Sequence, residues 1–422
     1  MRHIEMKESR AKTTMRHIEM KESRTNTDDD NVDDQPPSSS SVNIPLHILF
    51  FEIFTRLPVK SLCRFRCVCK SIRSLTLNNN NDPFFLDLHL SRSQTRPQAT
   101  TLLIPAIRSG NSFEILSAEV GGGPLTHLYT IPGGYDYHHR TFSFDVNGLL
   151  FFPGDSCSNT CPFVCNPTTR QFLKLPPLES CNPDTCYQVI DYFLGFDPST
   201  RIFKVVNIHL YLESDMMVCR VFTLGSHSSG GSWRTIHPGF PFEGCDWFIN
   251  PTKSVCLNGA IHWFLKAKNV IVAFDLKDEN FHVIPLPNHD GGVFQCQLSQ
   301  TVLIQVNGFL AVIGYNYPRF RIRKMEMWVL EDYQRHVWIN HIIDLPCSDY
   351  QYFRPLGSIP TGEILLLPYR NLSSVVSEVR VFYYDMKNRS FRITEIIQPP
   401  KGYGPASTTG GDGSMDYACL LF

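Results

Sequence analysis

The stretch IPLHILFFEIFTRLPVKSLCRFRCVCKSIRSL, residues 44–75, decides how the first part of this chain folds. Its apolar residues recur at the spacing of one helix face, which predicts an amphipathic helix. Pro45 suits the first turn of that helix, where its missing N–H is not needed. Pro58 disfavours the helical conformation at Leu57 and is predicted to end the helix. The residues predicted to share the apolar face are Leu46, Leu49, Phe50, Ile53, Phe54 and Leu57.

Two further short helices are predicted after Pro58, over Lys60–Cys67 and Val68–Leu77. A helical segment as short as Ile44–Leu90 cannot bury all of its own apolar surface. The excess of apolar surface therefore implies a partner. Periodicity alone also allows a second interpretation, in which the segment is a small helical corner of a larger core.

Over the rest of the chain, short β-rich runs alternate with Gly, Pro, Asn and Asp turns, and no long amphipathic helix appears. This alternation predicts an all-β fold. Turns that enter an apolar run recur, the last three at roughly 50-residue intervals, within the range of propeller blades. At that period, about 320 residues would build about six blades packed side by side in a ring. The recurring turns are Asn147-Gly148, Asn258-Gly259, Asn307-Gly308 and Thr361-Gly362.

A second type of turn is predicted where a strand ends in Asp or Asn. The side chain of such a residue can accept a hydrogen bond from the backbone that follows it and so close a hairpin. The candidates are Asn166, Asp197, Asp275 and Asp385.

The segment from Ile44 to about Leu77 closely resembles the F-box of plant F-box proteins, with no gap. The matching blocks span residues 44–46, 52–62, 64–71 and 73–75, and 82–85 is similar to the usual exit from that box. The chain departs from the family at Ile72, where a tryptophan is common, and at the asparagine run Asn78–Asn81. The resemblance implies docking to a Skp-type adaptor, with contacts from Ile44, Pro45, Leu49, Ile53, Phe54, Leu57, Pro58, Leu62, Val68 and Leu75.

Pieces of the later sequence resemble, in order and spacing, the F-box-associated domain of the same proteins. The resemblance covers nearly all of residues 100–395 and implies a kelch-like β-propeller that captures a substrate. The expected fold is therefore mainly β with a small α-helical N-terminal module: a three-helix F-box followed by about six blades. The matching pieces include Val146–Leu150, Asn166–Arg170, Leu194–Pro198, Leu257–Trp263 and Met327–Leu330.

The predicted domain boundaries follow these patterns. Met1–Arg10 recurs unchanged at Met15–Arg24 and precedes Asp-rich and Ser-rich runs, which predicts a disordered leader over 1–42. The F-box is predicted over 43–90, a linker over 91–101 and the β-propeller-like domain over 102–395. The remaining tail, 396–422, is predicted to close the last blade.

Composition restricts the partners and the compartment. A formal net charge of -1 over 422 residues argues against bulk binding to nucleic acid or anionic lipid. No run approaches the ~20 apolar residues of a membrane span, and the N-terminus lacks an apolar signal region. The 14 cysteines are therefore interpreted as reduced thiols, and we expect the protein in the cytoplasm, the nucleus or both.

No residue pattern predicts a catalytic residue, a metal or a cofactor. The loop cysteines are spaced too irregularly for a structural zinc site, which uses matched pairs. They are Cys157, Cys161, Cys165, Cys181 and Cys186.

Two further motifs each allow a structural and a functional interpretation. His262, beside Trp263, is interpreted as a strand residue that fills a blade rather than as a catalytic base. Arg319, Arg321 and Arg323 alternate and would share one face of a strand. Such a row is usually solvated, and its alternative role is to bind an acidic or phosphorylated substrate.

The leading hypothesis is a non-catalytic substrate-recognition subunit of a Skp–cullin–F-box ubiquitin ligase. The resemblance implies that the F-box binds the Skp adaptor, that the cullin is reached indirectly, and that the β domain binds an unknown protein substrate. One alternative is a propeller enzyme, such as a hydrolase with converging carboxylates or histidines around its channel. Another is an adaptor-bound scaffold that does not direct degradation.

Overall fold

The computed structural model divides into two compact units, Met1–Ala99 and Thr100–Phe422, and each is described by itself. The predicted leader, 1–42, lies outside the residues that the structure describes. The described residues are 44–45, 47–68, 83–94, 101–108, 112–130, 145–153, 161–178, 188–211, 216–225, 231–241, 254–265, 268–289, 292–293, 300–315, 324–346, 352–369, 378–397, 403–404 and 420–421.

The first unit contains helical elements, as predicted, but their types differ. The predicted first helix is a π-helix, η1 (Ile48–Ile53), continued by a 3-10 turn, η2 (Phe54–Arg56). Leu57 is extended (φ -83°, ψ 149°), which is the conformation that a following proline favours. Helix α2 (Val59–Val68) starts directly after Pro58, so the predicted second helix is confirmed with slightly wider bounds.

The third predicted helix falls on residues after Val68 that lie outside the described part of the chain. Helix α4 (Pro83–Gln94) runs past residue 90 into the segment predicted to be a linker. The prediction missed this extension because polar residues such as Ser91 and Ser93 resemble a linker, whereas Arg92 in the same turn binds the helical module.

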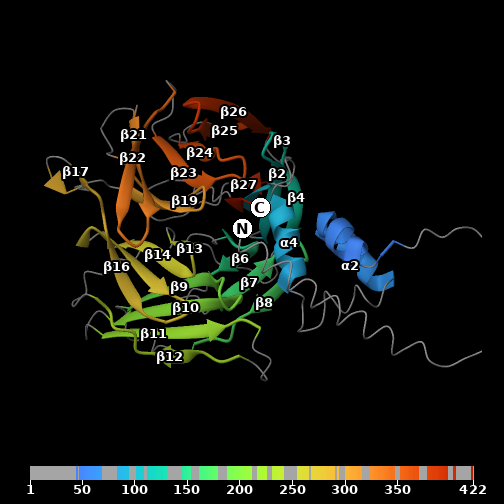
Figure 1. Ribbon diagram of the computed structural model, residues 1–422, viewed down its shortest axis with the longest axis horizontal. Helices are drawn as coiled ribbons and strands as arrows, with labels where there is room; N and C mark the ends of the chain where they lie inside the picture. Colours follow the sequence, from blue (N-terminus) through green and yellow to red (C-terminus); the bar gives the residue numbers. More distant parts are fainter. Residues whose placement is uncertain are drawn as a thin grey trace, which may run out of the picture. The chain divides into compact units, whose positions relative to one another are not determined.

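The second unit is a six-bladed β-propeller, as predicted (Figure 1). Each blade is built around three or four antiparallel strands that follow one another closely along the chain. Blade 1 contains β1 (Thr101–Arg108), β2 (Ser112–Glu119) and β4 (Thr126–Thr130), and blade 2 contains β5 (Asp145–Val146), β6 (Leu149–Phe152), β7 (Phe163–Asn166) and β8 (Gln171–Lys174). Blade 3 contains β9 (Gln188–Asp197), β10 (Ile202–Tyr211), β11 (Met216–Thr223) and β12 (Arg234–Ile236).

The other three blades continue this arrangement. Blade 4 contains β13 (Val255–Leu257), β14 (Ala260–Leu265), β15 (Val270–Asp275) and β16 (Phe281–Pro285). Blade 5 contains β19 (Gln300–Val306), β20 (Phe309–Tyr315), β21 (Lys324–Asp332) and β22 (Val337–Asp344), after a small hairpin of β17 (Asn288–His289) and β18 (Gly292–Val293). Blade 6 contains β23 (Tyr352–Ser358), β24 (Ile364–Tyr369), β25 (Glu378–Asp385) and β26 (Ser390–Ile397).

The Asn-Gly turns lie where they were predicted, between the first two strands of blades 2, 4 and 5. Both residues of each turn have positive φ, for example 53° at Asn258 and 81° at Gly259. Asn and Gly are the residues that tolerate this conformation, and such two-residue turns match the twist of antiparallel strands. In blade 6 the equivalent turn carries Gly362 with φ 89°.

The Asp and Asn turns also form as predicted. The side-chain Oδ1 atoms of Asn166, Asp197, Asp275 and Asp385 each accept a hydrogen bond from the backbone N–H two residues later. Asp332, which was not predicted, does the same for the turn after β21. In all five turns the fourth residue after the Asp or Asn has positive φ, from 50° to 60°. The five turns therefore share one conformation set by one side chain.

The apolar core lies between blades. One buried cluster joins blades 2 and 3, another joins 3 and 4, and others join 4 and 5, 5 and 6, and 6 and 1. At the junction of blades 1 and 2, Tyr129 packs edge-on against Phe172, with 5.7 Å between ring centroids. Each sheet thus buries its faces against its neighbours, which is why a blade is stable only within the ring.

The two ends of the second unit interlock. Short strands from the C-terminal tail, β27 (Tyr403–Gly404) and β28 (Leu420–Leu421), pair with β1. β3 (Gly123–Pro124) pairs in parallel with β26. The tail was predicted to close the last blade, but its strands join the sheet of blade 1, while the last blade receives β3. This reciprocal pairing closes the ring with backbone hydrogen bonds from both ends.

Candidate functional site

The helical module has its own small apolar core. Phe50, Phe51, Phe54, Leu62 and Phe85 are buried together, with Leu49, Leu57 and Leu88 packed against them. Phe54 and Leu62 are 4% and 6% exposed, so they do not offer their side chains to a partner as predicted. They were misassigned because helical periodicity identifies an apolar face without showing what covers it. α4 covers part of this face.

The apolar side chains that remain exposed define a candidate docking surface: Ile44, Ile48, Ile53, Phe65 and Val68. Val68 is 85% exposed and Ile44 is 48% exposed, whereas Ile48, Ile53 and Phe65 are between 36% and 41% exposed. Ile44, Ile53 and Val68 were predicted contacts; Ile48 and Phe65 are also exposed but were not among the predicted contacts. Among the other predicted contacts, Pro45 and Pro58 are exposed, Leu49 and Leu57 are half-buried, and Leu75 lies outside the described residues.

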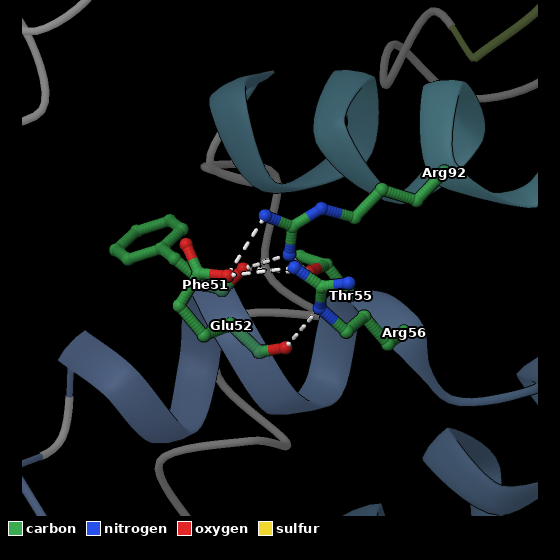
Figure 2. A network of polar contacts seen from close by, with 5 residues as sticks. All are labelled: Phe51, Glu52, Thr55, Arg56 and Arg92. Carbon is green, nitrogen blue, oxygen red and sulfur yellow. Dashed lines mark hydrogen bonds and ion pairs between the residues drawn. The ribbon is translucent and has the colours of Figure 1, made fainter.

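A polar network led by Arg92 fastens α4 to the first two helical turns (Figure 2). The guanidinium of Arg92 donates to Phe51 O, Thr55 Oγ1 and, at 3.0 Å, Glu52 Oε2. Thr55, which is fully buried, also donates to Phe51 O at 2.6 Å. Arg56 donates to the same Glu52 carboxylate at 3.1 Å, and this hydrogen bond is the main cause that lowers the pKa of Glu52.

This network positions the docking surface. Phe51 and Glu52 lie in η1, directly before Ile53, and their carbonyl and carboxylate groups are fixed from α4. His89 of α4 adds a contact of 3.0 Å between its Nε2 and Leu57 O, at the turn before Pro58. The middle and the C-terminal end of the η1–η2 segment are therefore held by side chains of α4.

The other candidate residues lie in the propeller unit or outside the described chain. Arg319, Arg321 and Arg323 all lie outside the described residues, as do Cys157, Cys181 and Cys186. Of the loop cysteines that are described, Cys165 is buried and Cys161 is partly buried. Within the described ranges, no group of three or more His, Cys, Asp or Glu side chains is arranged to hold a metal ion. None of the described helices is long and apolar enough to span a bilayer.

His262 occupies the place expected of a strand residue. It lies in β14 and is fully buried. Its burial lowers the pKa of the imidazole to about 4, so the ring is neutral near pH 7. Tyr333 Oη lies 2.7 Å from its Nε2, and Val255 O lies 3.1 Å from its Nδ1.

Fold and surface together define a two-module protein: a small helical module with an exposed apolar surface, followed by a six-bladed propeller. Comparison with known families agrees with both modules. Residues 43–83 match the F-box domain, and residues 125–406 match the F-box associated beta propeller domain. The chain belongs to the F-box proteins that carry an F-box associated β-propeller domain.

Related proteins occur in Arabidopsis thaliana. F-box protein At3g57590 is 30% identical over 370 residues, covering 82% of this chain and 83% of its own length. Putative F-box protein At1g47730 is 29% identical over 372 residues, covering 84% and 85% of the two chains. Among solved structures, the six-bladed fungal lectin of Aleuria aurantia aligns over 72% of this chain and 93% of its own, at 8% identity and a TM-score of 0.41. A structural match of that strength carries no argument about function.

Proposed function

We propose that this protein is the substrate-recognition subunit of a Skp–cullin–F-box ubiquitin ligase. The observation that carries the proposal is the set of exposed apolar side chains on an F-box module whose described residues also form a buried core of their own. Several large apolar side chains left exposed on so small a module favour a protein-interaction site over a solvated surface. The Skp-type adaptor is the partner that an F-box implies, and the cullin is reached through it.

In this proposal the propeller binds a protein substrate and the chain itself performs no chemistry. Its contribution is proximity, because a substrate lysine held near activated ubiquitin reacts at a raised effective concentration. The segments connecting the strands of a propeller are the natural recognition sites, since the blades themselves are committed to packing. The row of Arg319, Arg321 and Arg323 remains a candidate for acidic or phosphorylated substrate. The proposed compartment is the cytoplasm, the nucleus or both.

The adaptor contact is tested by introducing negative charge on the exposed surface of the full-length chain. Val68→Glu and Ile53→Glu introduce a carboxylate where an apolar contact is expected, and a purified plant Skp-type adaptor is the probe. We expect at least a tenfold loss of affinity, which corresponds to about 1.4 kcal/mol. Ile342→Glu is the matched control, because Ile342 is an apolar residue of the propeller with 56% exposure. Wild-type affinity in both F-box variants would contradict the proposal.

A second experiment separates the degradative role from the scaffold alternative. Partners are captured with the wild-type chain and with Val68→Glu while the proteasome is blocked. A substrate captured with the wild-type chain should accumulate and carry ubiquitin. The same substrate captured with the variant should carry no ubiquitin. A captured partner whose abundance and ubiquitin content are the same in both cases would indicate a scaffold that does not direct degradation.

A further inference from the structure

Three side chains form a hydrogen-bonded cluster at the junction of blades 4 and 5. Tyr333, in the turn between β21 and β22 of blade 5, places its Oη 2.7 Å from His262 Nε2 and 2.8 Å from His282 Nε2. Both histidines belong to blade 4, in β14 and β16. One hydroxyl therefore joins two strands of one blade to the next blade.

The register of blade 4 explains why one hydroxyl reaches both rings. Val255, His262, Ala273 and His282 lie opposite one another across β13 to β16. Directly opposed residues share a face of the sheet, so the backbone positions of the two histidines flank Ala273 about two strand spacings apart, ~9–10 Å, and their imidazoles converge on the hydroxyl between them. Ala273 is fully buried and carries only a methyl group, which leaves room for the edge of the tyrosine. The Tyr333 ring meets the two imidazoles edge-on, at 86° and 76°.

The hydrogen-bond partners determine which nitrogen of each ring carries the proton. His262 Nδ1 lies 3.1 Å from Val255 O, and a carbonyl only accepts, so Nδ1 is protonated. Neutral His262 then has a bare Nε2, which accepts from the Tyr333 hydroxyl. The Tyr333 oxygen has lone pairs left but no second proton, so His282 must donate to it through Nε2–H. Each of the three groups has one defined role in this arrangement.

We infer that this cluster is an acid-sensitive clasp between blades 4 and 5, opened when His262 takes up a proton. Protonated His262 would present Nε2–H to the Tyr333 oxygen, which already receives Nε2–H from His282. The tyrosine proton would then have no acceptor in the cluster, and the hydrogen bond that it donates between the blades would be lost. Proton uptake by His282 at Nδ1 leaves its Nε2–H donor in place, so the clasp is asymmetric and His262 is its sensitive member.

The surroundings keep the histidines neutral in the folded protein. Burial is the main cause that lowers the pKa of His262 to about 4; the hydrogen bond to Val255 O opposes the shift and the charge of His282 adds to it. Burial also lowers the pKa of His282; Asp275 opposes this shift and His336 adds to it. Burial is the main cause that raises the pKa of Tyr333 to about 12, and the charge of Asp275 contributes to the same rise. The rest of this face is apolar, from Val255, Leu257, Leu303, Leu310, Trp328 and Leu330.

The direction of the pH effect follows from the lowered pKa. In the unfolded chain a histidine takes up a proton below about pH 6.5. Folded His262 takes up a proton only near pH 4. The stability contributed by its neutral ring is therefore fully present above about pH 6.5 and declines as the pH falls toward 4. Between pH 7 and pH 5 this one residue should lower the equilibrium constant for folding by about 20-fold.

The test compares urea unfolding of the full-length chain at pH 7 and pH 5 for the wild type and His262→Gln. The glutamine Oε1 can accept from Tyr333 as Nε2 does, but it does not titrate. Between pH 7 and pH 5, we expect the equilibrium constant for folding to fall by a factor about 20 times larger in the wild type than in the variant. Exposed His237→Gln is the matched control and should behave as the wild type. Equal losses in the wild type and His262→Gln would overturn the inference.

A second measurement needs no stable His262 variant. Nitrogen-15 NMR of the histidine rings in the wild-type chain at pH 7 reports the protonated nitrogen of each ring. We expect His262 to carry its proton on Nδ1 and His282 on Nε2, with both signals shifted in Tyr333→Phe. The reverse assignment, or titration of both rings at the pH of an unfolded histidine, would overturn the clasp.

Discussion

Arg92→Gln is expected to loosen the helical module without touching its exposed apolar surface. Arg92 of α4 reaches Phe51 O, Thr55 Oγ1 and Glu52 together. Hydrogen bonds from a charged donor contribute roughly 1.5–3 kcal/mol each. Because the Arg92 side chain is 21% exposed and Thr55 still donates to Phe51 O, we expect the loss to be about 2 kcal/mol rather than the sum.

Hydrogen exchange of the full-length chain measures this loss locally. Amides of η1, η2 and α2 should exchange about 30-fold faster in the variant, the factor that corresponds to ~2 kcal/mol. Amides of the propeller should be unchanged. Arg56→Gln is the matched control, because Arg56 pairs with the same Glu52 carboxylate but is 64% exposed, where solvent screens the pair. Equal exchange rates in the two variants would refute the assignment of Arg92 as the fastening residue.

The remaining predictions concern the propeller. Gly259→Ala should cost more stability than Gly308→Ala, by about 1 kcal/mol in urea unfolding; both glycines have positive φ, but only at Gly259 would the new methyl group meet Pro198, at 3.2 Å. Equal costs would show that the approach to Pro198 is relaxed without strain. Trp263→Ala should destabilise by about 3–5 kcal/mol, because the indole is 1% exposed and stacks on a neighbouring blade; a loss below about 1 kcal/mol would contradict this packing. Burial raises the pKa of Glu279, but hydrogen bonds from Arg234 and Lys204 outweigh it and hold the pKa below its usual range. The ionised Glu279 therefore contributes stability above the ordinary carboxyl pKa of about 4.3, and this stability is lost only as the pH falls below that value. Glu279→Gln should therefore lower stability equally at pH 7 and pH 5.

Much of the fold could be predicted because its turns depend on one or two residues. Asn258 and Gly259 accept positive φ wherever they occur, and Asp275 can bond its own following backbone without help from the rest of the chain. Pro58 ends the first helical segment because its ring disfavours the helical conformation of the preceding residue, Leu57. Such local requirements, repeated at the interval of a blade, were sufficient to predict six sheets.

The candidate site was predicted less completely. Ile53 and Phe54 are adjacent apolar residues on one predicted face, yet Ile53 is 36% exposed and Phe54 is 4% exposed. Periodicity could not separate them, because the local π-helix changes the angular spacing of side chains and α4 covers one side of the face. The missed residue Phe65 was recognisable as apolar, but its exposure depends on what packs beside α2.

The sequence by itself therefore predicted the two modules, the family resemblance, a ring of about six blades and the conformation of several turns, and the turns could be predicted because each depends on residues close together in the chain. The tertiary structure alone decided which apolar residues of the helical module stay exposed and how the ring closes. It also brought His262 and His282 onto the hydroxyl of Tyr333, across sequence separations of 71 and 51 residues. Those contacts depend on the packing of distant segments, and no local pattern encodes which segments will meet.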